Sequence, residues 1–154
     1  MLTTYEQDVV KWSEEQAALL RQRDFSHLDI EHIAEEVEDV GKSEQRELMS
    51  HMVVLLAHLL KWEYQPERRG ASWEKTIKAQ RIEIAFNIKE TPSLKTRLEN
   101  EAWQQVVWAK AVSAAVAETD LDIFPEESPW TMQQVLSNEF FPGNNWPDHG
   151  IPKG

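Results

Sequence analysis

The stretch LMSHMVVLLAHLLKWEYQP, residues 48–66, carries the strongest pattern in this sequence. Its large apolar side chains recur three or four residues apart, and this spacing places them on one face of an α-helix. Pro66 limits the helix because proline has no backbone donor for a helix interior. The stretch therefore predicts a central core helix, with a buried stripe made of Leu48, Met52, Leu55, Leu56, Leu59 and Trp62.

Two further helical segments are predicted before this stretch. Thr3 or Thr4 is placed to cap a first helix that runs to about Arg23, and after a short connection Asp29 is placed to cap a second. Gly41 allows two interpretations: a left-handed cap that ends the second helix, or a tolerated glycine inside one long helix. The apolar face of this second helix consists of Ile30, Ile33, Ala34, Val37 and Val40. Its opposite face is acidic.

Three helices are predicted after the central stretch. Ser72 is placed to cap a helix that stops before Pro92, and Ser93 is placed to cap a long helix with an alanine-rich second half. Ser128, followed by a proline suited to the first helical position, starts a last short helix. The apolar face of the long helix is expected at Leu94, Leu98, Ala102, Val106, Ala109, Val112 and Val116.

Together these patterns predict an all-α fold, a single-domain helical bundle of about five to six helices. Residues 1–120 form the bundle, and residues 121–154 form a short helix and an irregular C-terminal arm that packs on it within the same domain. Five of the seven prolines lie in the last 35 residues, so regular structure thins out there.

Aromatic residues are expected to anchor several of these segments. Phe140, Phe141 and Trp146 are candidates for holding the C-terminal arm on the bundle. Trp103 and Trp108 lie five residues apart on the long helix, so we expect at least one of them to be partly exposed.

Composition restricts the partners and the compartment. The 154 residues contain no cysteine, which excludes disulfides and cysteine-based zinc sites. The formal net charge of −11 disfavours binding to nucleic acid or anionic lipid, and no apolar run approaches the roughly 20 residues of a membrane span. The N-terminus lacks the basic start and apolar stretch of a secretory signal. We therefore expect a cytoplasmic protein that binds neither nucleic acid nor membrane.

Several stretches of the chain resemble one bacterial family. They are YEQD at residues 5–8, IAEEVEDVG at 33–41, HLLKWEYQPERR at 58–69, SW at 72–73, QR at 80–81, PSL at 92–94 and FPEESP at 124–129. Taken jointly, they resemble the family catalogued as domain of unknown function 29 over nearly the whole chain. The resemblance implies a helical fold and brings no established activity, so it supplies no catalytic residues.

Histidines and glutamates at helical spacing are candidates for a catalytic or metal site. His58 interrupts the most apolar run and needs a polar partner if it is buried, for which Glu35 or Glu36 is suited. With His51 as a third candidate, a bundle core could hold an acid/base pair or a metal ion. The Glu-x-x-His pairs of helical di-metal proteins are absent, however, and we expect no metal or other cofactor. Glutamates on one helix face are more commonly a solvated surface.

A second candidate is the local basicity around residues 61–81. Arg68 and Arg69 precede a helix start, where backbone donors favour an anion, and Lys61 and Arg81 add charge nearby. The alternative is that these residues pair with the acidic second helix, within the molecule or across an oligomer.

The sequence leaves three functions to compare. It contains no nucleophile motif and no glycine-rich phosphate loop, so we favour a non-enzymatic protein that binds another protein or forms a homo-oligomer through an exposed helix face and the C-terminal arm. The alternatives are a metal-dependent or acid/base enzyme that uses His58, His51 and Glu35, and an anion-binding module at Arg68 and Arg69.

Overall fold

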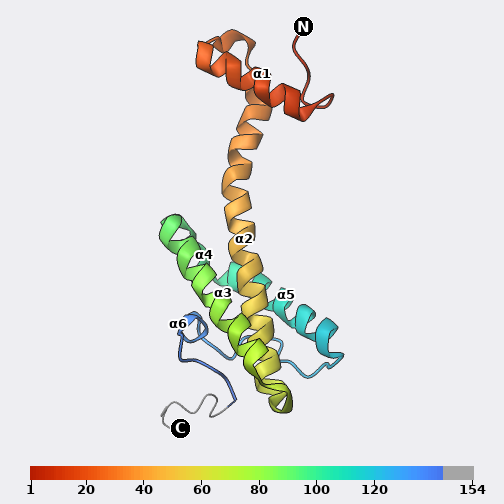
Figure 1. Cartoon of the computed structure of the whole chain (residues 1–154), viewed down its shortest axis with the longest axis vertical. Coiled ribbons are helices and arrows are strands. Elements are labelled where there is room, and N and C mark those ends of the chain that lie inside the picture. Colours follow the sequence, from red (N-terminus) through yellow and green to blue (C-terminus); the bar gives the residue numbers. More distant parts are fainter. Residues whose placement is uncertain (144–154) are drawn as a thin grey trace. The chain divides into compact units, whose positions relative to one another are not determined.

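The computed structural model describes residues 1–143, and all regular structure in this range is helical, which confirms the all-α prediction. Trp146 lies outside the described residues. None of the described helices is long and apolar enough to cross a bilayer. The helices, shown in Figure 1, are α1 (Val9–Gln22), α2 (Ile30–Tyr64), α3 (Ala71–Glu90), α4 (Lys95–Glu99), α5 (Glu101–Thr119) and α6 (Met132–Leu136).

The chain divides into two compact units, residues 1–44 and residues from Gln45 onward. Helix α2 contributes its first part to the first unit and its second part to the second. Gly41 lies inside this helix, and apart from its chain neighbours and the backbone of its own helix no atom lies within 4 Å of where its Cβ would be. Of the two interpretations of Gly41, the tolerated glycine inside one long helix is therefore the observed one.

The first unit begins with a different cap from the one expected. Asp8 caps α1 by accepting hydrogen bonds from the backbone N–H groups of Val10 and Lys11 on Oδ1, at 3.1 Å each. Thr3 does not cap the helix, because its backbone N–H and hydroxyl both donate to the Glu15 carboxylate. The prediction that Thr3 or Thr4 caps the helix was wrong, since the aspartate carboxylate reaches two free donors at once.

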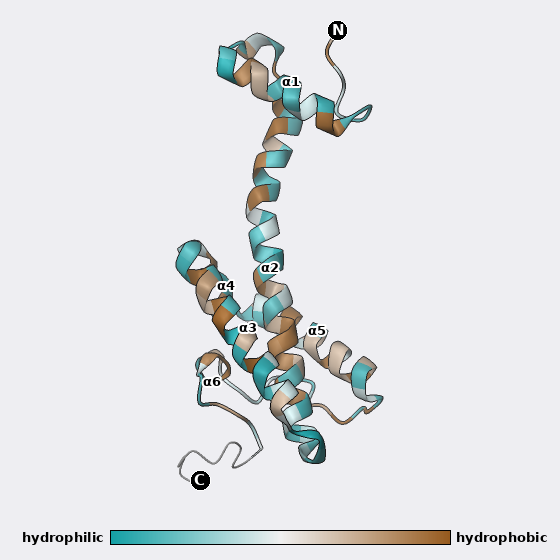
Figure 2. Cartoon of the chain, viewed as in Figure 1, coloured by the Kyte–Doolittle hydropathy of each residue, from teal (hydrophilic) through white to brown (hydrophobic). Residues whose placement is uncertain are grey.

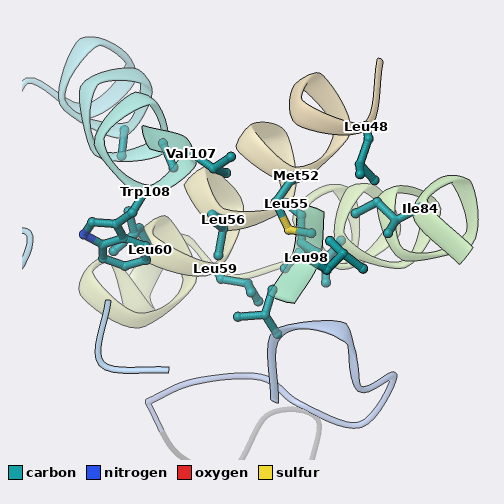
Figure 3. Packing of buried hydrophobic residues seen from close by; sticks show 14 of the residues in the cluster. Leu48, Met52, Leu55, Leu56, Leu59, Leu60, Ile84, Leu98, Val107 and Trp108 are labelled. Atoms are coloured by element: carbon teal, nitrogen blue, oxygen red, sulfur yellow. The ribbon is translucent and has the colours of Figure 1, made fainter. Parts of the chain in front are cut away.

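The second unit is built on the predicted stripe of α2. Leu48, Met52, Leu55 and Leu59 are each 0% exposed, and they form one cluster with buried residues of α3, α4, α5 and α6. Figure 3 shows how side chains from these helices converge on Leu55, Leu56 and Leu59. The prediction of a central core helix is confirmed.

Two of the predicted caps in the second unit were wrong. Helix α3 begins one residue after Gly70 and has no side-chain cap, so Ser72 lies inside its first turn. The long helix expected after Ser93 is instead a short turn at Pro92–Leu94 followed by α4 and α5. The break lies at Asn100, whose backbone is extended and whose side-chain oxygen accepts from the Trp103 N–H at 2.8 Å.

The break also changes which face of α5 is buried. Ala102, Val106 and Ala109, which were expected to face the core, are exposed. Trp103 and Trp108 are 8% and 3% exposed, so the expectation that one of them is partly exposed was wrong. The buried arc is wide enough to include both indoles, and its members are Trp103, Val107, Trp108, Ala111 and Ala115.

The last helix begins later than expected. Thr131 caps α6 in a capping box, in which its hydroxyl accepts from the Gln134 N–H and Gln134 Oε1 accepts from the Thr131 N–H. Ser128 instead hydrogen-bonds with the backbone of Trp130. Because the reciprocal pair satisfies two free groups, it determines the helix start more strongly than Ser128 and its following proline.

Replacing the cap at the α4–α5 break gives a direct test of this local structure. We expect Asn100→Ala to lower the free energy of unfolding by about 1 kcal/mol, because it removes the acceptor for the Trp103 N–H. Asn138→Ala is the matched control, since Asn138 is exposed and caps no helix. Urea unfolding of both variants measures the difference, and equal stabilities would contradict the capping role.

Candidate functional site

A buried lysine organises one polar cluster of the second unit. Lys61, on α2, is 7% exposed, and its Nζ lies 2.6 Å from Oε2 of Glu118 on α5. The same ammonium lies 5.2 Å from the centre of the Trp73 ring. Lys61 was a candidate for binding an anion, and its charge is already neutralised by a carboxylate of the same unit.

His58 belongs to the same cluster and is held within α2. Its Nδ1 donates to the carbonyl of Val54 at 2.9 Å, and its Nε2 lies 3.5 Å from Lys61 Nζ. Burial lowers the pKa of His58, so the ring is neutral near pH 7, with the proton on Nδ1. Both ring nitrogens are therefore engaged, and the ring has the hydrogen bonds that a half-buried histidine requires.

The remaining residues of the proposed catalytic set have other partners or belong to the other unit. His51 Nδ1 is 2.7 Å from Oε1 of Gln80, which lies on α3, and its Nε2 is 3.6 Å from Glu47 Oε1. Glu35 belongs to the first unit and is exposed. In the part of the chain that the structure describes, no group of three or more histidine and acidic side chains is arranged to hold a metal ion.

Two arginines fasten the C-terminal segment to the core. Arg81 on α3 is 3% exposed and donates from Nε to the Val135 carbonyl at 3.0 Å and from Nη2 to the Phe140 carbonyl at 2.7 Å. Arg69 donates to the carbonyls of Trp62 and Gly143. Burial lowers the pKa of Arg81 to about 10, which leaves it charged near pH 7. Both candidate anion ligands therefore have structural hydrogen bonds.

Aromatic contacts add to this attachment. Phe141 lies 5.0 Å from Trp62 between ring centres, and Phe140 lies 5.8 Å from Trp130. The Trp108 indole N–H donates to the Pro125 carbonyl at 3.0 Å.

Arg68 is the remaining basic residue that was a candidate for binding an anion. It is exposed at the turn before α3.

The attachment through Arg81 can be tested by removing its guanidinium. We expect Arg81→Met to lower the free energy of unfolding by about 2–4 kcal/mol, because the carbonyls of Val135 and Phe140 lose a charged donor. Amide hydrogen exchange in residues 131–140 should accelerate. Arg68→Met, which removes an exposed arginine, is the control. An unchanged exchange rate in Arg81→Met would show that the arginine does not hold this segment.

The first unit contains a polar and aromatic cluster that the sequence reasoning missed. The Tyr5 ring stacks on the His32 ring at 4.3 Å, and its hydroxyl donates to Glu36 Oε1 at 2.6 Å. Asp29 Oδ2 accepts from the Trp12 indole at 2.9 Å and lies 2.7 Å from His32 Nδ1. The only sequence signal for this cluster is the spacing of Asp29 and His32 at a helix start, which was interpreted as a cap alone.

Electrostatics favours the charged form of His32 in this cluster. The hydrogen bond to Asp29 raises the pKa of His32, and the carboxylates of Asp29, Glu6 and Glu35 add to the effect. Burial alone would raise the pKa of Asp29, but hydrogen bonds from His32 and Trp12 lower it on balance. The cluster is therefore strongest where Asp29 is ionised and His32 is protonated.

This cluster predicts a pH dependence for the first unit. The raised pKa of His32 contributes stability that is complete below its unfolded pKa of about 6.5 and is lost as the pH rises through the folded value. The lowered pKa of Asp29 has the opposite pH dependence. Its contribution to stability is complete above the unfolded pKa of about 3.9 and is lost as the pH falls through the lower, folded pKa. Side-chain NMR titration of His32, with amide exchange of residues 3–15, checks both limits.

His32→Gln is the matched variant for this titration. In this variant the amide protection of residues 3–15 should no longer fall at high pH, whereas it should still fall at low pH. If the protection factors of residues 3–15 in the wild-type protein, which correct for the intrinsic pH dependence of amide exchange, did not change between pH 5 and 8, the proposed role of His32 would be wrong.

An exposed apolar stripe runs along the first part of α2. Ile30, Val37 and Val40 are 62%, 67% and 69% exposed, and helical spacing places them on one face. Figure 2 shows hydrophobic segments interleaved with hydrophilic ones along this part of the helix. Residues 1–44 contain twelve aspartates and glutamates against four lysines and arginines. We call Ile30, Val37 and Val40 the acidic-unit stripe.

Comparison with known proteins identifies one relationship. Residues 4–141 match the model of the family described as domain of unknown function DUF29. No curated protein and no solved structure matches the chain. The match confirms the resemblance seen in the sequence and adds no chemistry to the residues described above.

Proposed function

Because this chain belongs to the DUF29 family of domains of unknown function, its role has to be inferred from its own residues, and we propose that it is a non-enzymatic interaction protein. Its first unit binds a partner protein through the acidic-unit stripe. The partner presents an amphipathic helix whose apolar face is flanked by lysine and arginine.

Exposure of the stripe is the observation that carries this proposal. Three β-branched aliphatic side chains, each more than three-fifths exposed, follow one face of a helix. The buried part of the first unit is small, with Trp12 and Gln16 as the buried residues of α1. A stripe of this kind matches the helix-in-groove mode, in which apolar side chains at helical spacing meet a partner's apolar face.

Charge selects the partner over a second copy of the chain. The excess of eight acidic residues in residues 1–44 accounts for most of the net charge of −11. Two such units would repel each other across a shared stripe, whereas a basic helix would be attracted and its encounter accelerated. The flanking residues that supply the charge include Glu31, Glu35, Glu38 and Asp39.

A designed pair of peptides tests the proposal. A synthetic amphipathic peptide of roughly 20 residues, long enough to become helical on binding, carries leucine on one face and lysine and arginine beside it. A control peptide has the same sequence with the basic residues replaced by glutamate. We expect the basic peptide to bind the full chain and to shift the NMR signals of residues 30–40. The glutamate peptide should not bind.

Variants distinguish binding through the acidic-unit stripe from non-specific hydrophobic binding. The double variant Val37→Ser and Val40→Ser should weaken peptide binding about tenfold, because it removes apolar contact area. The control is Ile82→Ser with Ile123→Ser, which alters two exposed aliphatic residues of the second unit. Sedimentation of the free chain measures self-association. A dimer that the Val37→Ser and Val40→Ser changes dissociate, without any peptide binding, would overturn the proposal in favour of a homo-oligomer.

A further inference from the structure

Gly41 lies in the exposed first part of α2, at a position where the described contacts of the chain do not require a glycine. A glycine inside a helix destabilises it relative to alanine, because glycine loses more backbone freedom on folding. Apart from its chain neighbours and the backbone of its own helix, no described atom lies within 4 Å of where its Cβ would be. Its backbone is helical and has no positive φ. Neither a close internal contact nor a left-handed conformation therefore explains the residue.

Helical spacing makes Gly41 the floor of a space on the surface of α2. Residues i, i+3, i+4 and i+7 of a helix surround one hole, which can receive a side chain of a packed partner helix. Val37 and Val40 belong to the acidic-unit stripe, and the missing side chain of Gly41 opens the space between them. Glu44 completes the set, and all four residues belong to the first unit. We call these four residues the Gly41 hole.

Glu44 gives the Gly41 hole a charged edge. It is partly exposed, and its carboxylate has no hydrogen bond or ion pair among the residues that the structure describes. The residues one turn away on either side are Val40, Gly41, Glu47 and Leu48, so α2 itself offers no cation at pairing distance. The hole is therefore aliphatic on two sides, open at its floor and acidic at one edge.

A lysine or arginine of a partner helix has the shape and the charge that suit this hole. We propose that the partner helix of the acidic-unit stripe places one lysine or arginine in the Gly41 hole, with its aliphatic stem over Gly41 and its cationic end against Glu44. The stem removes apolar surface from water, and the cation pairs with a carboxylate that lacks a partner among the described residues. This inference rests on the proposed function and names the residue of the partner that α2 selects.

Two forms of the basic amphipathic peptide test the charge. At the centre of the leucine face, one form carries lysine and the other carries norleucine, which has a similar stem and no charge. Calorimetry with the full chain gives the ratio of their affinities. This ratio should fall about threefold in Glu44→Gln, because the variant removes the paired carboxylate. Glu31→Gln, which removes the same charge outside the hole, should keep the ratio. A ratio that Glu44→Gln leaves unchanged would overturn the proposal.

Variants of Gly41 test the position of the partner side chain. Gly41→Leu fills the hole and should weaken binding of the lysine peptide at least about tenfold. Ser43→Leu, at an exposed residue on the opposite face of α2, should bind as the wild type does. Gly41→Ala should weaken binding about threefold and yet slow the amide exchange of residues 38–44, because alanine stabilises the helix. A glycine with a purely structural role would not produce these opposite effects.

The wild-type chain distinguishes the failure of this inference from the failure of the proposed function. If the wild-type chain bound neither peptide, the proposed function would be wrong, and this inference with it. If the wild-type chain bound the lysine peptide and folded Gly41→Leu bound it equally well, only the assignment of the Gly41 hole would be wrong.

Discussion

The apolar stripe on the second part of α2 is the constraint on which the second unit depends. Every buried residue of this helix lies between Leu48 and Trp62, and buried side chains of four other helices meet them. Fully burying one leucine contributes about 1.5–3 kcal/mol, so this stripe outweighs any single cap or ion pair in the unit. The positions of α3, α5 and α6 follow from the need to cover it.

Once the core stripe of α2 is covered, the polar residues beside it become engaged in structural contacts. Lys61 must find a carboxylate when it is buried, and Glu118 on α5 supplies one. Arg81 becomes a clamp for the C-terminal segment because carbonyls of Val135 and Phe140 lie within its reach. Lys61 and Arg81, which look like members of an anion-binding set in the sequence, are thus engaged in holding segments of the unit together.

The sequence predicted the parts of the fold that depend on strong periodicity. The core stripe of α2 and the end of α3 before Pro92 were correct, because apolar spacing and proline act locally. The cap positions were less predictable, since Thr3 and Ser128 each compete with a nearby residue that satisfies more donors, and Ser93 lies inside a short turn before α4. The break at Asn100 turned the expected face of the first part of α5 away from the core, because one extended residue resets the helical phase.

The candidate site was harder to predict for a physical reason. His58 was expected to need a partner, but a sequence does not reveal that the Val54 carbonyl of the same helix supplies it. The cluster of Tyr5, His32 and Asp29 depends on contacts between residues up to 31 positions apart, which no local spacing encodes. The exposure of Val37 and Val40 was also not predictable, because an apolar helix face usually indicates a buried one.

Our central claim is that α2 has a buried, stability-determining part and an exposed part available for binding. Hydrogen exchange along this one helix in the full chain tests it most directly. We predict that amides of residues 52–62 exchange only on global unfolding. Amides of residues 33–43 should exchange through local opening, with protection factors lower by about a hundredfold or more. Uniform protection from Ile33 to Trp62 would contradict the claim, because it would mean that the first part of α2 is as strongly buried as the second.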